Sequence, residues 1–288
     1  MSLTLDVGSS TLDNGHLQVI DYSGRTIRLG EPAKRIIALA PHIVENIYRI
    51  GAGDSIVGTV NYADYPEAAR GILRVGNIQS VSVEAIIALR PDLIVAWSSS
   101  LSPKIAQQFS RLGLPVYMDE PQVLSDVAKS IRDMGILTGN ADSSEVIASD
   151  FLTRLSLLEK RYRDRDTVSV LYQIWNTPLQ TISEQHIISD VIRLCGGRNS
   201  FADAAVIAPK ISIESVLRRD PDVIIASGVG DKRPDWLEDW KSWTQLTAVK
   251  NHHLFFVPAD LLQRHTVRLL LGAEDLCEQL ERARKNLQ

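Results

Sequence analysis

The sequence predicts an α/β protein with two lobes, each built on a parallel sheet, joined by one long helix. Short apolar runs of strand length alternate with amphipathic helical stretches along most of the chain, which is typical of parallel sheets covered by helices on both faces. One fifteen-residue pattern occurs twice, in Ser82–Ala96 and in Ser212–Ala226. The length of 288 residues also corresponds to about two average domains.

The first 34 residues are predicted to be an N-terminal extension that ends in a hairpin. Residues 17–29 alternate apolar and polar side chains around Gly24, as two short strands joined by a glycine turn would. The N-terminal lobe is predicted to follow over residues 35–141. Its expected strands are 35–40, 56–60, 93–96 and 116–118, and its expected helices are 43–50, 83–89, 102–112 and 123–137.

Residues 142–166 are predicted to form the helix that links the lobes. No glycine or proline interrupts this segment, and Ser143 or Ser144 is its expected N-cap. A helix of about 20 residues spans roughly 30 Å. The C-terminal lobe is then predicted over residues 167–288, where Gly196–Asn199 is expected to be a helix cap and turn. The apolar segments that continue the alternation there are 168–173, 187–194, 213–217, 223–226 and 276–287.

The repeated segments explain why two lobes are expected. Each copy starts with a serine that can cap a helix, has a glutamate two residues later, and ends in a Pro-Asp turn and an apolar strand. Six of the fifteen positions are identical. Unrelated helix–turn–strand units can converge on Pro-Asp turns, but the matching Ser-x-Glu starts favour two related lobes. A cleft between such lobes is a preferred place for a small ligand.

Composition and charge exclude two classes of protein. Lys and Arg number 31 against 35 Asp and Glu, so the net charge of −4 argues against a generally basic nucleic-acid binder. No apolar run approaches the roughly 18 residues of a membrane span. The N-terminal Met-Ser-Leu-Thr-Leu-Asp lacks the basic and apolar regions of a secretory signal, so either the protein is cytosolic or a signal was removed.

Motifs of common enzyme classes are missing from the sequence. Ala40-Pro41-His42 follows the first strand of the N-terminal lobe in place of Gly-x-Gly-x-x-Gly, and neither a phosphate-binding loop nor a Gly-x-Ser-x-Gly elbow occurs. None of the six histidines forms a His-x-x-x-His pair, although His42 and His265 follow strands and are weak candidates for facing a ligand. An α/β enzyme with an active site between the lobes is the alternative from a different class.

Aromatic side chains follow several expected strands. Tyr62, Trp97 and Trp175 all lie at carboxyl ends of strands, where they can serve as a platform for a flat ligand or simply pack. Arg264 follows the last strand and can supply a charge-assisted hydrogen bond. Trp236, Trp240 and Trp243 differ, because their spacing forms one helical stripe and therefore predicts core packing.

Two pairs of residues have both a structural and a functional interpretation. Glu84 and Glu214 occupy equivalent repeat positions, where they stabilise a helix N-terminus or dock onto a two-fold symmetric partner. Cys195 and Cys277 are the only cysteines. Composition leaves open whether they are buried thiols or a disulfide, which would close a loop of about 80 residues and contribute roughly 4 kcal/mol.

Three stretches carry a resemblance to a known family: Val60–Pro66, Val83–Trp97 and Leu194–Asn199. From about Arg35 to the C-terminus the chain resembles the substrate-binding proteins of ABC importers for cobalamin, ferric siderophores and haem. The cobalamin branch is the most similar. The hairpin Asp21–Ile27 is typical of the siderophore branch.

The resemblance implies two Rossmann-like lobes bridged by a rigid helix, with a ligand cleft between them. It implies that Glu84 and Glu214 dock against a dimeric ABC permease and that Cys195 and Cys277 form a disulfide. Tyr62 and Trp97 match aromatic residues that pack on the corrin, whereas Ile78 and Ala208 stand where the cobalamin branch has tryptophan. The full predicted ligand set is Pro41, Tyr62, Ile78, Trp97, Trp175, Ala208, Asp260 and Arg264.

The function expected from the resemblance is capture of a cobalamin-like corrinoid and its delivery to the permease and its ATPase subunits. A ferric siderophore or haem is the alternative cargo. We expect a monomeric, non-enzymatic protein without a resident cofactor, catalytic residue, protein-bound metal or nucleic-acid partner. We also expect it to act in the periplasm or another extracytoplasmic space, with its export signal removed.

Overall fold

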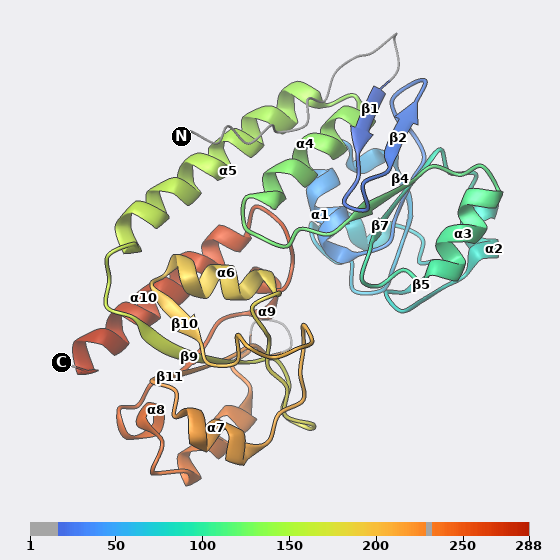
Figure 1. Cartoon of the computed structure of the whole chain (residues 1–288). Coiled ribbons are helices and arrows are strands. Elements are labelled where there is room, and N and C mark those ends of the chain that lie inside the picture. The colour runs from blue at the N-terminus through green and yellow to red at the C-terminus, as the bar shows by residue number, and fades with distance from the viewer. Residues whose placement is uncertain (1–16, 229–231, 288) are drawn as a thin grey trace. The chain divides into compact units, whose positions relative to one another are not determined.

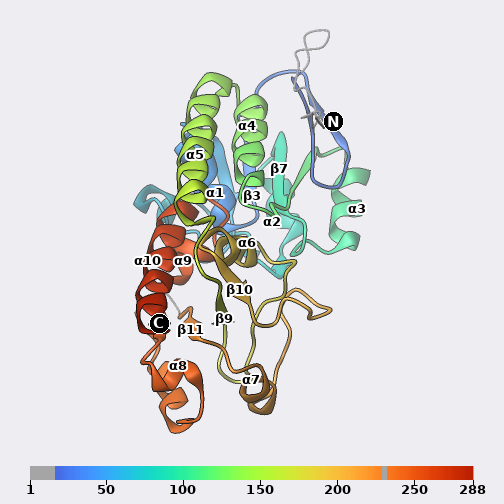
Figure 2. The same ribbon diagram turned by 60° about the vertical axis from the view of Figure 1, so that its left-hand side comes forward.

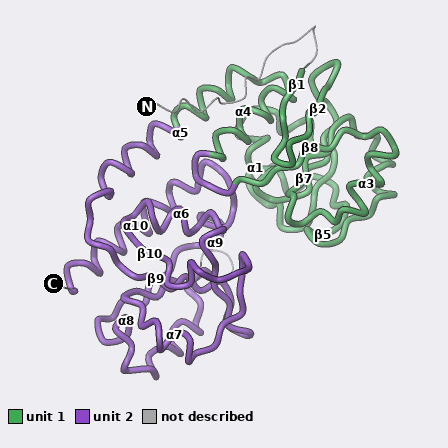
Figure 3. Tube along the Cα trace, in the orientation of Figure 1, with its two compact units in different colours: residues 1–121, 126–150 green, residues 122–125, 151–288 purple. Residues whose placement is uncertain are grey.

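The computed structural model describes residues 17–228 and 232–287. Within them the chain folds into two compact units (Figure 3). Unit 1 extends to residue 121 and includes residues 126–150, and unit 2 comprises residues 122–125 and the chain from residue 151 onward. The first 16 residues of the predicted N-terminal extension lie outside the described residues.

Unit 1 is built on a four-stranded parallel sheet with the strand order β4-β3-β7-β8 (Figure 1). Ile37 and Ile94 of the two central strands pack with Phe109 in its core. The strands of this sheet are β3 (Ile36–Ala38), β4 (Ile56–Thr59), β7 (Leu93–Trp97) and β8 (Val116–Asp119). Its helices are α1 (Pro41–Arg49), α2 (Val83–Ala88), α3 (Pro103–Arg111) and α4 (Asp126–Thr138), with short 3-10 turns at Gly53–Ser55 and Glu67–Gly71.

Two antiparallel hairpins complete unit 1. The predicted N-terminal hairpin consists of β1 (Leu17–Ile20) and β2 (Thr26–Leu29), and β1 lies against α4. A second hairpin consists of β5 (Gly76–Asn77) and β6 (Ser80–Val81).

Unit 2 repeats this architecture with the strand order β10-β9-β11-β12, again with parallel pairing throughout. Leu171 and Ile224 of its central strands pack with Trp240. The strands are β9 (Val168–Gln173), β10 (Gly197–Asn199), β11 (Val223–Ala226) and β12 (Leu254–Phe256). The helices are α6 (Ile187–Leu194), α7 (Ile213–Arg219), α8 (Thr247–Lys250), α9 (Ala259–Leu262) and α10 (Leu269–Leu287), with a 3-10 helix at Asp235–Ser242.

The two copies of the repeat have the same local structure. Ser82 caps α2 by accepting a hydrogen bond from the amide of Ala85, and Ser212 caps α7 in the same way through Ser215. The strands that follow, β7 and β11, occupy the same position in the two sheets. The prediction of two related parallel-sheet lobes is therefore confirmed.

A single helix of 22 residues, α5 (Ala141–Tyr162), carries the chain from unit 1 into unit 2 (Figure 3). Its first turn differs from the prediction. The helix starts at Ala141, so Ser144 is not its N-cap but lies one turn inside, where its hydroxyl donates to the carbonyl of Ala141 at 2.8 Å.

Three further predictions need correction. Gly196 does turn the chain at a φ of 69°, but Gly197–Asn199 continues as strand β10, because its backbone pairs with β9. Helix α4 begins at Asp126, three residues later than predicted, and α10 begins at Leu269, before the predicted residue 276. The tryptophan stripe packs in the core as predicted, on a 3-10 helix.

Helices α6 and α10 of unit 2 lie side by side, as Figures 1 and 2 both show. The disulfide between Cys195 and Cys277 joins the end of α6 to α10. This confirms the pairing that the family resemblance implies. Among the described residues, no helix combines the length and the apolar character needed to cross a membrane.

Candidate ligand-binding site

The predicted ligand residues of unit 1 lie at or near the carboxyl edge of its sheet. Pro41 opens α1 directly after β3, and Trp97 is the last residue of β7. Tyr62 follows β4, has a side chain that is 81% exposed and adopts a left-handed φ of 65°. Ile78 lies in the turn of the β5–β6 hairpin. This hairpin is tied to the Tyr62 loop by a 2.9 Å hydrogen bond from the amide of Asn61 to the carbonyl of Gly76.

The Trp97 indole has specific partners on two sides. Its Nε1–H donates to Oε1 of Glu120 at 3.2 Å. The ring of His42 meets it edge to face, with a centroid separation of 5.6 Å and an interplanar angle of 89°. A half-buried aromatic ring with its polar atom bonded is suited to stacking on an apolar ligand.

A buried polar chain continues behind Trp97. Nε2 of His42 lies 3.3 Å from Oδ2 of Asp119, and the other oxygen of this carboxylate accepts from the hydroxyl of Ser130 at 2.5 Å. The Ser130 hydroxyl is 3.1 Å from that of Tyr22, which belongs to the turn of the N-terminal hairpin. The side chains of both His42 and Asp119 are nearly inaccessible to solvent.

A second buried carboxylate lies beside this chain. Asp133 accepts a hydrogen bond from the Tyr117 hydroxyl at 2.7 Å and is ion-paired with Lys129. Burial raises the pKa of Asp133, although Lys129 and Tyr117 act in the opposite direction. Burial, followed by the charge of Asp119, also raises the pKa of Tyr22, so its phenol stays protonated.

The predicted ligand residues of unit 2 lie in the segments that follow its strands, with Asp260 in helix α9. Trp175 follows β9, is 48% exposed and donates its indole N–H to the carbonyl of Thr177 at 3.0 Å. Ala208 is exposed in a loop that runs beside the segment after Trp175. Arg264 forms a 3.0 Å ion pair with Asp260, and its side chain is only 12% exposed. The two charged residues are therefore brought together.

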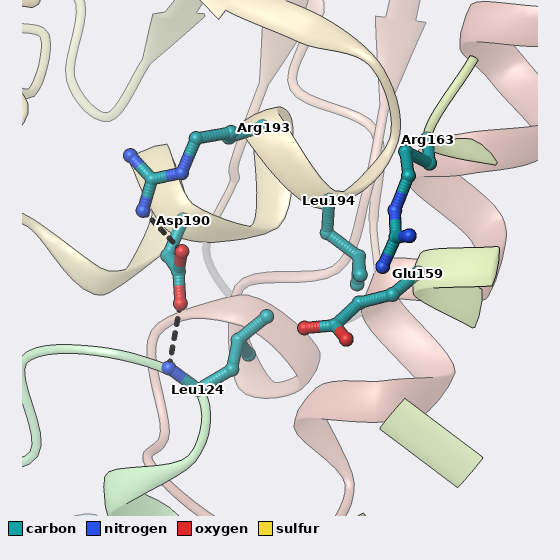
Figure 4. Close-up of a pocket in the computed structure, with 6 residues that line it drawn as sticks. All are labelled: Leu124, Glu159, Arg163, Asp190, Arg193 and Leu194. Atoms are coloured by element: carbon teal, nitrogen blue, oxygen red, sulfur yellow. Dashed lines mark hydrogen bonds and ion pairs between the residues drawn. The ribbon is translucent and has the colours of Figure 1, made fainter. Parts of the chain in front are cut away.

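A pocket of about 390 Å³ lies elsewhere in unit 2, between helix α6 and the end of α5 (Figure 4). None of the predicted ligand residues lines it. Arg193 is paired there with Asp190, and Asp190 also accepts from the amide of Leu124 at 2.7 Å. We assign these contacts a structural role, because they anchor residues 122–125 to unit 2.

The paired glutamates are both exposed in the first turns of their helices. The Ser82 hydroxyl lies 3.3 Å from Oε2 of Glu84, and a hydrogen bond from Ser212 lowers the pKa of Glu214. Both carboxylates are thus held, one on each unit, at the start of equivalent helices. No group of three or more potential metal ligands occurs among residues 17–228 and 232–287.

Sequence reasoning did not identify Glu120, which binds the Trp97 indole, or Asp119, which lies behind His42. A signal for the acidic pair was present, because it directly follows an apolar strand of the parallel sheet, where ligand-facing residues gather. His42 was a weak candidate for facing a ligand, but it is buried and reaches Asp119 and Trp97 instead.

The fold and the site residues define a class of protein: two similar parallel-sheet units with aromatic and charged residues in the loops after their strands. Residues 36–261 match the model of the family described as periplasmic binding protein. This chain belongs to that family.

Known relatives are similar over nearly their whole length. The chain is 36% identical to the vitamin B12-binding protein of Vibrio cholerae over 88% of this chain and 91% of that protein. The crystal structure of the periplasmic vitamin B12-binding protein BtuF of Vibrio cholerae matches with a TM-score of 0.82, over 88% of this chain and 99% of that one. The periplasmic heme-binding protein RhuT of Roseiflexus sp. RS-1 shares the fold at 22% identity, with a TM-score of 0.77 over 87% of this chain and 99% of that one.

Proposed function

We propose that this chain is the substrate-binding protein of an ABC importer and that its cargo is a cobalamin-like corrinoid. The observation that carries the proposal is the 36% identity to the vitamin B12-binding protein of Vibrio cholerae over nearly the full length of both chains. That relative is a binding protein by name, which supports a non-enzymatic role.

The chemistry of the predicted residues supports a large, flat and mostly apolar ligand. Tyr62, Trp97 and Trp175 present exposed or half-exposed rings. Such rings contribute contact area and stacking to the binding of a flat ligand. Arg264, oriented by Asp260, supplies a fixed donor for a carbonyl or other polar group on the ligand periphery.

The alternative cargo is a ferric siderophore or haem. Ile78 and Ala208 stand at positions where the cobalamin branch has tryptophan, so fewer indoles are available to enclose a corrin. An iron chelate of smaller apolar area requires fewer such contacts. The similarity to the heme-binding protein concerns the fold alone.

Delivery completes the proposed function. Glu84 and Glu214 would dock against arginines of a two-fold symmetric permease, which carries its own ATPase subunits. Equivalent positions on two related units suit such a partner. The protein would act as a monomer in the periplasm or an equivalent extracytoplasmic space, where its disulfide persists.

The test is titration of the purified chain with cyanocobalamin, a ferric hydroxamate, a ferric catecholate and haemin, followed by calorimetry. We expect saturable one-to-one binding of cyanocobalamin and at least tenfold weaker binding by Trp97→Ala. Trp243→Phe is the control, because Trp243 is partly buried against the core of unit 2 and is not a predicted ligand residue. If an iron chelate binds more tightly than cyanocobalamin, the cargo is the ferric siderophore or haem and not a corrinoid. Binding of none of the four ligands would refute the importer proposal.

A further inference from the structure

The Trp97 indole is held from two directions by residues to which the family resemblance assigns no role. Glu120 accepts from its N–H, and His42 contacts the ring. We propose that Glu120 and His42 are positioning residues, which fix the Trp97 indole in its ligand-binding orientation before the ligand arrives. This inference rests on the proposed function, because it takes Trp97 to be a ligand-stacking residue.

Glu120 is itself fixed by the loop that follows Trp97. Its Oε2 accepts from the backbone amide of Ser99 at 2.6 Å, and its Oε1 accepts from the hydroxyl of Ser99 at 2.7 Å. Oε1 therefore has two donors, the Ser99 hydroxyl and the Trp97 indole N–H. Because an indole has a single N–H, an acceptor with a fixed position selects one orientation of the ring.

His42 provides the second constraint, from the neighbouring strand–helix junction. Its imidazole is buried and packs edge to face on the indole, so the Trp97 ring cannot rotate in that direction without displacing a buried side chain. Nε2 of the imidazole lies 3.3 Å from Oδ2 of Asp119, whose other oxygen accepts a hydrogen bond from the Ser130 hydroxyl.

The chain of contacts reaches the N-terminal hairpin. The Tyr22 hydroxyl lies 3.1 Å from that of Ser130 and donates to the carbonyl of Asp126 at 2.7 Å, so the hairpin packs against the residues that orient His42. The N-terminal hairpin precedes the residues matched by the family model, and these contacts give it a role in the structure around Trp97. Tyr22 of the hairpin is thus the last residue of the polar chain.

Ordering of the Trp97 side chain before the ligand arrives should raise the binding affinity by a measurable amount. Immobilising a rotamer-rich side chain on binding costs about 0.5–1.5 kcal/mol, which corresponds to about a two- to tenfold loss of affinity. A Trp97 side chain that is already ordered avoids this loss. Removing the Glu120 acceptor should therefore weaken binding within that range, and much less than removing the indole.

The experiment uses the full chain labelled with 5-fluorotryptophan and observed by ¹⁹F NMR. The five tryptophans give separate probes, and Trp97→Phe assigns the resonance of Trp97. In the ligand-free protein we expect Glu120→Ala to shift and broaden this resonance, whereas Glu120→Gln, which keeps an acceptor oxygen, preserves its line width. Glu184→Ala is the matched control, because Glu184 pairs with Arg193 in unit 2.

His42 is tested by two substitutions that separate its contacts. His42→Phe keeps a ring beside Trp97 and loses the contact with Asp119, whereas His42→Gln keeps a polar group and loses the ring. We expect both to broaden the Trp97 resonance. Because a buried His42 variant can fail to fold, Glu120 provides the decisive comparison.

Affinity is measured in parallel with whichever of the four ligands the wild type binds most tightly. A two- to tenfold loss for Glu120→Ala, restored by Glu120→Gln, supports the inference. An unchanged Trp97 resonance in Glu120→Ala overturns it, as does a changed resonance with unchanged affinity. If the wild type binds no ligand, the proposed function fails together with the ligand-binding part of this inference, while the resonance still decides whether Glu120 and His42 hold the indole.

Discussion

The sheets of the two units share a frame but differ at their carboxyl edges. In both, the repeated segment supplies a capped helix, a Pro-Asp turn and the third strand in the order. Beyond the shared alanines Ala96 and Ala226, the chains diverge: Trp97 corresponds to Ser227. Asp119, paired with Trp97 at the end of β8, corresponds to Val257, the residue that follows β12 and its last pair, Ala226 with Phe256.

The carboxyl edges of the two sheets differ because their side chains need different hydrogen-bond partners. Asp119 is a buried carboxylate and requires His42 and Ser130 as partners, so the edge of unit 1 carries a polar chain. Val257 has an apolar side chain that needs no such partners, and the Ser227 hydroxyl accepts a hydrogen bond from Gln263 at 2.6 Å. Helix caps and Pro-Asp turns therefore maintain the shared strand order in both units, while the residues at the carboxyl ends of the strands differ.

The largest expected effect concerns the paired glutamates, where the two units should act alike. Replacing both Glu84 and Glu214 by alanine should reduce ligand uptake by a reconstituted importer more than tenfold, because both carboxylates are exposed for docking. Each single variant should give an intermediate loss. Affinity should be unchanged, and Glu159→Ala on helix α5 serves as the control. A matching loss of affinity would contradict the docking role.

Removal of the disulfide should lower the stability of unit 2 and leave the stability of unit 1 unchanged. Cys195 and Cys277 are separated by 82 residues within unit 2. Replacing both by alanine should lower the free energy of unfolding of unit 2 by about 4 kcal/mol in the chain-entropy model. Hydrogen exchange by mass spectrometry should show lost protection in α6 and α10. Strands β7 and β8 provide the internal control, and equal losses there would argue against a local effect.

The two Pro-Asp turns allow a test of whether the two units are equivalent, with a smaller expected loss of stability. Asp92 accepts from the amides of Lys34 and Arg35 at 2.8 and 3.0 Å, just before β3. Asp222 accepts from the amide of Ser169 at 2.8 Å, at the start of β9.

Both aspartates therefore join the turn before the third strand to the start of the first strand in their sheet. Asp92→Ala and Asp222→Ala should each cost about 2 kcal/mol, the usual range for hydrogen bonds to a charged group. Urea unfolding measures both losses, and the asparagine variants, which retain an acceptor oxygen, should lose less. A loss in only one unit would show that the two turns are not equivalent.

Much of the fold could be predicted because the signals are local. The hairpin around Gly24, the Ser82 and Ser212 caps and the alternating strands and helices depend on residues close together in sequence. Strand β10 was missed because Gly197 has no strand-forming side chain. Its structure comes from backbone pairing with β9, which only the folded sheet supplies.

The candidate site could be predicted only in part. Trp97 was identified because it ends an apolar strand, and Trp175 because it follows one. The residues that hold Trp97 could not be identified in the same way, since Glu120 is 23 residues from it in sequence. Proximity between such residues follows from the pairing of β7 with β8, which brings Trp97 opposite Asp119.

The two related α/β lobes, the long helix between them and the aromatic residues after the strands are all encoded locally. They arise from periodicity, capping and turn chemistry within short segments. The polar chain behind Trp97 is different, because it joins Tyr22 to Ser130, 108 residues apart, and forms only when the chain has folded. A buried carboxylate such as Asp119 takes its partners from the segments that the sheet brings next to it, and no local pattern encodes which segments those are.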